Sequence, residues 1–525
     1  MKSISFSPLE KGYYNNLVKD YINQTENTKT LYHNYFDKAG FEKTISERKF
    51  PQENREVLVQ QLSESYINSA SESQLQNIEL LKSENTYTIT TGHQLCLAAG
   101  PLYSIYKILT CIVYVQKLKT WFPDKNFVPV FWMAGEDHDI EEIKSLNIFG
   151  KDYTWDTAQT GPTGRMQTVG IDNLLDEIKT LFANDEKTTS IIEKIKQDYH
   201  TSDLKQGTFN LINDLFKNMG LLVLDPDNAA LKSLFAKYII DDIIHHKNYN
   251  PLTEQTTIIE QNYKPQLYIR DINFFYLQPS KRERIIQEEN KYYTNDKSKS
   301  WSEEEIIQEI KEHPENFSPN AALRPLYQET ILPNIAYTGG PGELAYWLQL
   351  YKMFGANDID FPVLLPRYSA ILISKSVNER IEKLKLNSID FLEEEKAIIE
   401  KYISLQDNSD EINFSDELEI LFQLKSKISQ RINPIDPTLI PQVDNLFNKS
   451  IEQLNSIETR LKNTSQKKYE TDINKIKKLR EDLFPQGSPQ ERIQNYIQFA
   501  MRFPLSEIYE SFLKSDTNGS IIIEE

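Results

Sequence analysis

The sequence predicts an α/β protein with a parallel sheet, followed by a helical region with a coiled-coil pattern. Between residues 86 and 370, short apolar runs of strand length alternate with helical patterns. This alternation is typical of a parallel sheet whose strands are joined by right-handed helical crossovers. After about residue 371 the strand signals stop, and apolar residues recur at heptad spacing. That second pattern is typical of a coiled coil.

Composition limits the classes of partner. The 525 residues are enough for two or three domains, and the formal net charge of −18 argues against non-specific binding to nucleic acid or to an anionic membrane. The sequence contains no apolar run near 18 residues, so we expect no transmembrane helix. Cys96 and Cys111 are the only cysteines and have apolar neighbours, which favours buried core residues over a disulfide or a thiolate metal site. We expect a cytoplasmic protein.

The elements are predicted in order along the chain. Residues 8–83 read as amphipathic helices, and β-prone or apolar runs predict five strands at residues 86–90, 127–133, 221–224, 331–337 and 361–365. Helical patterns occupy residues 95–118, 141–146, 173–181, 202–219 and 343–354, with an irregular stretch at 150–170. About 100 residues separate the third and fourth strands, too many for one crossover, so this segment predicts an inserted subdomain. The expected domains are residues 1–85, 86–370 with an insertion at about 226–325, 371–483 and 484–525.

The heptad pattern is clearest late in the chain. Apolar residues occupy one position of four successive heptads, and weaker residues follow three positions later: Ile440, Phe447, Leu454 and Leu461, then Val443, Ser450, Ile457 and Thr464. A less regular repeat precedes it, and Pro434 and Pro437 separate the two. Because proline ends helices, an antiparallel helical hairpin is predicted. An ordinary helical bundle is the alternative.

The first candidate site follows the first predicted strand. Thr91, Gly92, His93 and Gln94 lie where this strand turns into a long apolar helix. Backbone N–H groups at a helix start attract anions, and a histidine there can donate a hydrogen bond to developing negative charge. The alternative is a helix start at which the threonine and glutamine serve only as caps.

The second candidate site follows the second predicted strand. Glu136, Asp137, His138 and Asp139 are four consecutive ionisable residues at its end. Carboxylates there can hold Mg²⁺, and the Asp-x-Asp spacing resembles the metal motif of sugar-nucleotide transferases. His138 suits proton transfer better than Mg²⁺. A solvated, capped helix start is the alternative.

The third candidate site follows the fourth predicted strand. Three glycines in four residues allow a close approach of the backbone to a ligand, and a carboxylate comes next: Gly339, Gly340, Gly342 and Glu343. The alternative is a tight turn. Arg324 and Arg367 lie near predicted loops or strand ends and can bind a carboxylate or phosphate in bidentate fashion, although each alone is more often a surface residue.

The three clusters are expected to meet. Each follows the carboxyl end of a predicted strand, and in a parallel sheet those ends share one edge. We therefore expect His93, Asp137 and Gly340 to lie close together in one pocket, although they are far apart in the sequence.

Four stretches of the sequence resemble one family. TTGHQLCLAAGPLYSIYK, PVFWMAGEDHDIEEI, LRPLYQETILPNIAYTGGPGELAYW and FPQGSPQERIQN are similar to motifs of the bacillithiol biosynthesis BshC proteins, the cysteine-adding enzymes. They span residues 90 to 495, nearly the whole chain. The resemblance implies a Rossmann-like core related in shape to class I aminoacyl-tRNA synthetases, with connecting-peptide insertions. It also implies a C-terminal coiled coil that forms a homodimer.

The resemblance further implies a role as a ligase. The expected reaction joins cysteine to glucosaminyl-malate through an amide bond, the last step of bacillithiol synthesis. An amide does not form from a free carboxylate without activation, so ATP or another adenine nucleotide is expected, and no metal is firmly predicted. Candidate catalytic residues are His93, Asp137 and His138. The residues expected to bind substrate are Thr91, Gly92, Gln94, Glu136, Arg324, Gly339, Gly340, Gly342, Glu343 and Arg367. The alternatives are a metal-dependent nucleotide-sugar transferase using Asp137 and Asp139, and a non-catalytic coiled-coil scaffold with a ligand-binding core.

Overall fold

The computed structural model describes residues 1–9, 13–406, 413–515 and 519–525. The chain forms two compact units. The first comprises residues 1–372 and 490–523, and the second comprises residues 373–489 and 524–525. Among the described residues, no helix combines the length and apolar character needed to cross a membrane.

A five-stranded parallel sheet forms the centre of the first unit. Its order is β13-β12-β2-β3-β6, with bounds Val363–Pro366, Asn334–Gly339, Thr86–His93, Asn126–Met133 and Leu222–Leu224. Every neighbouring pair is parallel. From β2 the chain adds β3 and β6 on one side, then returns to place β12 and β13 on the other. The predicted α/β fold is confirmed, and the strand order reverses between β2 and β12, where open sheets of this kind bind ligands.

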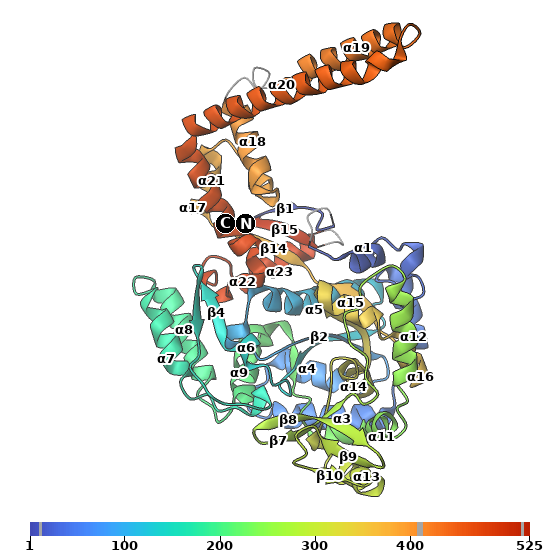
Figure 1. Ribbon diagram of the computed structural model, residues 1–525. Helices are drawn as coiled ribbons and strands as arrows, with labels where there is room; N and C mark the ends of the chain where they lie inside the picture. Colours follow the sequence, from blue (N-terminus) through green and yellow to red (C-terminus); the bar gives the residue numbers. More distant parts are fainter. Residues whose placement is uncertain (10–12, 407–412, 516–518) are drawn as a thin grey trace. The chain divides into compact units, whose positions relative to one another are not determined.

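Helices cover this sheet and complete the unit. The helices of the first unit are α1 Asn16–Ile22, α2 Lys38–Glu47, α3 Gln52–Ser65, α4 Glu72–Leu80, α5 Leu102–Trp121, α6 Ile140–Ile143, α7 Ile171–Thr180, α8 Glu186–Asp198, α9 Leu204–Phe216, α10 Ala229–Ser233, α11 Ala236–Ile243, α12 Tyr249–Glu260, α13 Glu303–Glu312, α14 Arg324–Ile331, α15 Pro341–Leu348, α16 Tyr351–Ala356, α22 Gln490–Ile493 and α23 Leu505–Lys514. The crossover helix from β2 to β3 is α5, and α15 and α16 connect β12 to β13 (Figure 1).

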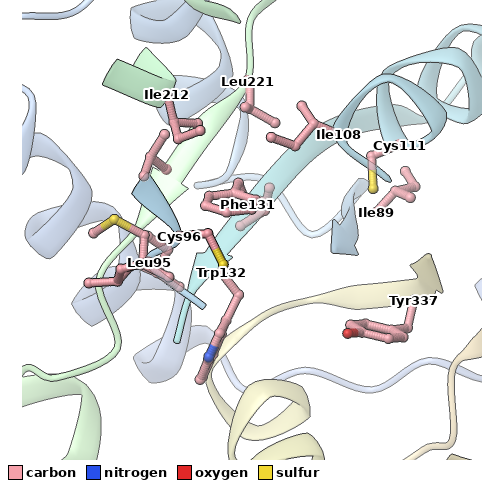
Figure 2. Close-up of a cluster of buried hydrophobic side chains, with 14 of the residues drawn as sticks. Ile89, Leu95, Cys96, Ile108, Cys111, Phe131, Trp132, Ile212, Leu221 and Tyr337 are labelled. Carbon is pink, nitrogen blue, oxygen red and sulfur yellow. The ribbon is translucent and has the colours of Figure 1, made fainter. Parts of the chain in front are cut away.

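The core lies between the sheet and these helices. Ile89 of β2 and Phe131 of β3 pack near Ile108 and Cys111 of α5 (Figure 2), and all four are buried. Both β2 and β3 are buried on both faces, which explains why their sequences are continuous apolar or threonine-rich runs. Cys96 and Cys111 are free and buried, as predicted.

A second sheet lies in the sequence between β6 and β12. It is antiparallel in the order β10-β9-β8-β7-β11, with bounds Ser300–Trp301, Lys291–Thr294, Lys281–Glu288, Phe274–Gln278 and Phe317–Pro319. Figure 1 shows it beside α13. This sheet falls within the segment for which the sequence predicts an inserted subdomain.

Two smaller sheets complete the strands. One joins β1, β15 and β14, with bounds Lys2–Ser5, Ser520–Glu524 and Ser369–Ile373, and the other pairs β4 Ser145–Ile148 with β5 Lys151–Thr154. The helix predicted over residues 141–146 is therefore wrong in its second half. The structure ends α6 at Ile143 because the next residues pair as a hairpin strand.

The second unit is helical and includes the predicted hairpin. Its helices are α17 Lys375–Lys383, α18 Glu395–Gln406, α19 Ser415–Ile432, α20 Ile440–Lys468 and α21 Glu470–Leu483. The helices α19 and α20 run side by side (Figure 1), and Lys425 of α19 forms an ion pair of 3.0 Å with Asp444 of α20. The turn between them contains the two prolines that end the first helix.

Candidate functional site

A cavity of about 490 Å³ lies at the carboxyl ends of the central strands, beside the point where the strand order reverses. Gly92 and His93 enter it from the end of β2, Glu136 and Asp137 from the loop after β3, and Glu343 from α15. The three clusters that the sequence places at separate strand ends therefore meet in one cavity. A cavity of this size accommodates a small organic ligand.

His93 is the last residue of β2 and faces the cavity. Burial, together with the nearby Lys107, lowers the pKa of its imidazole to about 3, although Glu343 opposes the shift. The imidazole is therefore neutral at physiological pH. Its ring packs against Tyr103 with 5.2 Å between ring centroids, which fixes its position. A neutral, fixed imidazole can donate a hydrogen bond to an oxygen that becomes negative.

Gly92 allows β2 and β3 to lie close together. A Cβ added at Gly92 would lie 3.3 Å from both the Cβ and the carbonyl oxygen of Trp132 on β3. A larger residue would therefore push β2 from β3 directly beneath His93.

Asp137 forms the acidic side of the cavity. Its Oδ2 accepts a hydrogen bond of 2.9 Å from Nε2 of Gln94, and its Oδ1 lies 3.6 Å from Nη1 of Arg282 on β8. Burial raises the pKa of Asp137, but Gln94 and Arg282 outweigh it, so the pKa stays below its ordinary value. Asp137 is therefore ionised at neutral pH. The second sheet supplies a wall of the cavity here, because Arg282 also stacks on Phe275, 4.1 Å from the ring centroid.

Glu136 is directed toward a buried network of charges. Its carboxylate forms an ion pair with Lys232 of α10, which in turn lies 3.5 Å from Asp227. Arg165 holds Asp227 in bidentate fashion with two distances of 2.9 Å. Burial raises the pKa of Glu136, and Lys232 opposes this shift. This network attaches the loop after β3 to the loop after β6.

The sequence analysis missed Lys107, a central residue of the site. It lies in the second turn of α5, its side chain is 2% exposed, and its ammonium lies 2.7 Å from Oε2 of Glu343. It also donates to the carbonyl oxygen of Gly92. Tyr337 and the backbone N–H of Gly340 donate further hydrogen bonds to Glu343, at 2.6 and 2.9 Å. Burial raises the pKa of Glu343, but Lys107 and these donors reverse the shift and lower it.

Arg324 is the cation of the cavity that faces neutral groups. Its guanidinium lies 5.8, 5.5 and 5.9 Å from the ring centroids of Trp132, Tyr337 and Trp347. It donates to Oε1 of Gln328 at 3.0 Å and to the hydroxyl of Tyr346 at 3.3 Å. Within the described residues it forms no ion pair with a carboxylate. A guanidinium held this way is suited to a carboxylate or phosphate of a ligand.

Several predicted site residues lie around the cavity rather than on its surface. These are Thr91, His138, Gly339, Gly340, Gly342 and Arg367. Thr91 donates to the carbonyl oxygen of Thr338 at 2.8 Å and so joins β2 to β12. Arg367 pairs with Glu491 at 2.5 Å, which occupies its guanidinium. Their roles in binding or catalysis stay predictions.

The Asp-x-Asp pair does not converge on one point. Asp137 faces the cavity, whereas Oδ1 of Asp139 accepts from the backbone N–H of Glu141 at 3.1 Å and caps α6. In the part of the chain that the structure describes, no group of three or more histidine, cysteine, aspartate or glutamate side chains is arranged to hold a metal ion. This geometry gives the transferase alternative no support.

Comparison with known proteins places the chain in one family. Residues 1–368 match the family described as bacillithiol biosynthesis BshC, N-terminal Rossmann-like domain, and residues 370–522 match its C-terminal coiled-coil domain. The chain belongs to the bacillithiol biosynthesis BshC family. The resemblance inferred from the sequence motifs is thus confirmed, together with the Rossmann-like and coiled-coil domains.

Relatives in the BshC family cover nearly the whole chain. A Flavobacterium johnsoniae protein is 38% identical over 93% of this chain and 93% of its own length. A Christiangramia forsetii protein is 36% identical over 94% and 93%, and a Bacillus cytotoxicus protein is 29% identical over 93% and 94%. All three bear the name "Putative cysteine ligase BshC".

Proposed function

We propose that this protein is the cytoplasmic ligase that joins the carboxyl group of cysteine to the amino group of glucosaminyl-malate, the last step of bacillithiol synthesis. Its membership of the BshC family supports the reaction class. The observation that carries the assignment of substrate is the cavity itself. It is lined by the guanidinium of Arg324, which has no carboxylate partner among the described residues, and by the ionised carboxylate of Asp137.

The two sides of the cavity match the two kinds of group on the sugar conjugate. Arg324 would bind a malate carboxylate, because its described hydrogen-bond partners are neutral and it forms no ion pair with a carboxylate among the described residues. Asp137 would accept a hydrogen bond from the amino group, because the lowered pKa of its carboxyl keeps it negative at neutral pH. The sugar would span the distance between the two side chains.

His93 would act on the reacting carbonyl. Attack of the amine on an activated cysteine carboxyl forms the C–N bond, places negative charge on the carbonyl oxygen, then expels the activating phosphate group and one proton. The neutral imidazole can donate a hydrogen bond to that oxygen. An adenine nucleotide would supply the activation, and its position stays a prediction.

The proposal is tested with the purified protein, ATP, cysteine and glucosaminyl-malate. We expect the thiol conjugate by mass spectrometry, with one nucleotide cleaved per product. The variants H93N, D137N and R324A should each lower kcat/KM at least 100-fold, because one lost charge-assisted or transition-state hydrogen bond costs about 3 kcal/mol.

The matched control is H245Q. It replaces an exposed histidine that does not line the cavity, so it should keep full activity. Absence of product from the wild-type protein under every nucleotide and divalent-cation condition would contradict the proposal. Wild-type activity in all three variants, H93N, D137N and R324A, would instead favour a different site.

A further inference from the structure

A buried polar network begins at Arg324 and runs away from the cavity. Nη1 of Arg324 donates to Oε1 of Gln328 one helical turn later, at 3.0 Å. Nε2 of Gln328 donates in turn to Oε1 of Glu329, at 2.9 Å. Both Gln328 and the side chain of Glu329 are 0% exposed. None of these partners was identified from the sequence.

The carboxylate of Glu329 receives a second amide from β12. Nδ2 of Asn334 donates to the same Oε1 atom at 2.7 Å. The other end of this amide, Oδ1 of Asn334, accepts from the hydroxyls of Thr88 and Thr90 at 3.2 and 2.8 Å. Both threonines lie on β2, the strand that ends in His93.

An arginine holds the carboxylate from the opposite side. Nη2 of Arg48, at the end of α2, lies 3.4 Å from Oε2 of Glu329 and 2.9 Å from its backbone oxygen. Burial raises the pKa of Glu329 to about 7, and Arg48 opposes that rise. Because two N–H groups converge on Oε1, this oxygen stays an acceptor in either protonation state, and any proton resides on Oε2.

This arrangement determines how Gln328 faces Arg324. The two ends of a glutamine amide have nearly the same shape but opposite hydrogen-bonding character. An acceptor beside Nε2 reinforces the orientation that presents Oε1 to the donors of the guanidinium, and Glu329 is that acceptor. The same oxygen orients Asn334 toward β2.

We propose that Gln328 and Glu329 are positioning residues that aim the guanidinium of Arg324 at the carboxylate of the sugar conjugate and fix it relative to the strand that carries His93. The inference rests on the proposed function, because it takes Arg324 as the ligand for that carboxylate. Neither residue contacts the substrate, so each acts through Arg324.

The variant Q328M tests this role. Methionine has nearly the same length but accepts no comparable hydrogen bond, so the guanidinium loses one of its two fixed partners. We expect the KM for glucosaminyl-malate to rise about tenfold, which corresponds to about 1.4 kcal/mol, while the KM for cysteine stays within twofold of the wild-type value. The conservative variant E329Q keeps an acceptor at the shared position and should raise the KM less than threefold.

The matched control is Q255M. Gln255 is also fully buried in the first unit, its Nε2 donates to the carbonyl oxygen of Leu348 at 3.1 Å, and neither residue lines the cavity. This variant carries the same loss of one buried amide, so a KM effect confined to Q328M separates positioning from general destabilisation.

A double-mutant comparison tests whether Gln328 acts through Arg324. In the R324K background, the Q328M substitution should change the KM less than threefold, because the fork that it positions is gone. A tenfold change in both backgrounds would mean independent roles and would overturn the proposal. Crystals of ligand-free Q328M give a second readout, in which Arg324 should leave the position that it has in the wild-type protein.

The two proposals fail in different ways. A wild-type protein that forms no product contradicts the proposed function. A wild-type protein that is active, with an unchanged KM and an unchanged Arg324 position in Q328M, overturns the positioning role alone.

Discussion

His93 shows how the environment of one residue sets its chemistry. The sequence identifies a histidine at a strand end, which is compatible with either a base or a hydrogen-bond donor. The structure buries it, and the resulting pKa of about 3 makes it a poor base near neutral pH. A donor role to a developing oxyanion is therefore the better interpretation, and it needs no change of protonation during the reaction.

The shifted pKa of His93 predicts a dependence of stability on pH. An unfolded histidine takes up a proton near pH 6.5, whereas the folded one does so only near pH 3. Between these values the unfolded chain binds an additional proton, so lowering the pH through this window favours unfolding. The contribution of His93 to stability is complete above pH 6.5 and is lost as the pH falls.

Thermal unfolding checks this expectation. The decrease in Tm from pH 8 to pH 5 should be smaller in H93Q than in the wild-type protein, because the variant has no proton to take up at that position. H245Q, which alters an exposed histidine, serves as the control. An identical decrease in H93Q and the wild-type protein would rule out the depressed pKa.

At the scale of residues, sequence reasoning found the site residues that directly follow strands and missed Lys107, which lies on a helix. Gln94, Glu136, Asp137 and Glu343 follow predicted strands, and a parallel sheet brings such positions together. Lys107 lies within a largely apolar helix, and its role depends on how α5 packs against β2 and β3. The available signal was a charge inside the apolar run Leu102–Val115, since the other lysines of α5, Lys117 and Lys119, lie near the end of the helix.

At the scale of elements, the ion pair between Lys107 and Glu343 connects the helices that leave β2 and β12. These two strands flank the reversal of strand order, so α5 and α15 begin on either side of the cavity. The pair therefore fixes the spacing of the helices at the point where the ligand is expected.

The variant K107M should destabilise the protein by about 3 kcal/mol, because it leaves the carboxylate of Glu343 without its cation in a largely buried position. The double variant K107M/E343Q should recover at least half of that loss, since it removes the unpaired charge as well. Tm values from differential scanning calorimetry give the comparison. If the double variant were less stable than K107M by the full cost of a second independent substitution, the two side chains would not be coupled.

Element boundaries show where sequence patterns are insufficient. The strands of the central sheet were predicted within a few residues, because each is an apolar or β-branched run ended by polar or glycine residues. The helix predicted from residue 95 instead begins at Leu102, after Ala98, Ala99 and Gly100 adopt positive φ values of 50°, 64° and 71°. Two alanines in that conformation have no sequence signature, because alanine normally favours helix.

At the scale of the whole molecule, the chain order explains why the site draws on distant segments. The strand after the insertion, β12, pairs with β2 on the side opposite β3, so residues near positions 93 and 343 meet at the ends of two neighbouring strands. The insertion contributes as well, since Phe275 and Arg282 line the same cavity. The composition of that wall was not predictable, because the second sheet has no motif that indicates which face meets the core.

The second unit presents apolar surface of its own. Along the α19–α20 hairpin, Phe422, Ile435, Leu446 and Ile457 are 54%, 86%, 63% and 47% exposed. Isolated exposed apolar residues are common, but several of them on a hairpin that matches a coiled-coil domain are typical of a surface that associates. A homodimer through this hairpin stays a prediction.

Shortening the hairpin separates association from catalysis. Replacing residues 422–450 with a short glycine-serine linker removes the distal part of both antiparallel arms and three of those four apolar residues. Because the cavity lies entirely in the first unit, the shortened protein should form product with a kcat within threefold of the wild-type value. Its mass by light scattering should change from a dimer to a monomer. The scaffold alternative requires the opposite pattern, in which thiol production in cells survives the combined H93N and D137N substitutions and is lost when the hairpin is shortened.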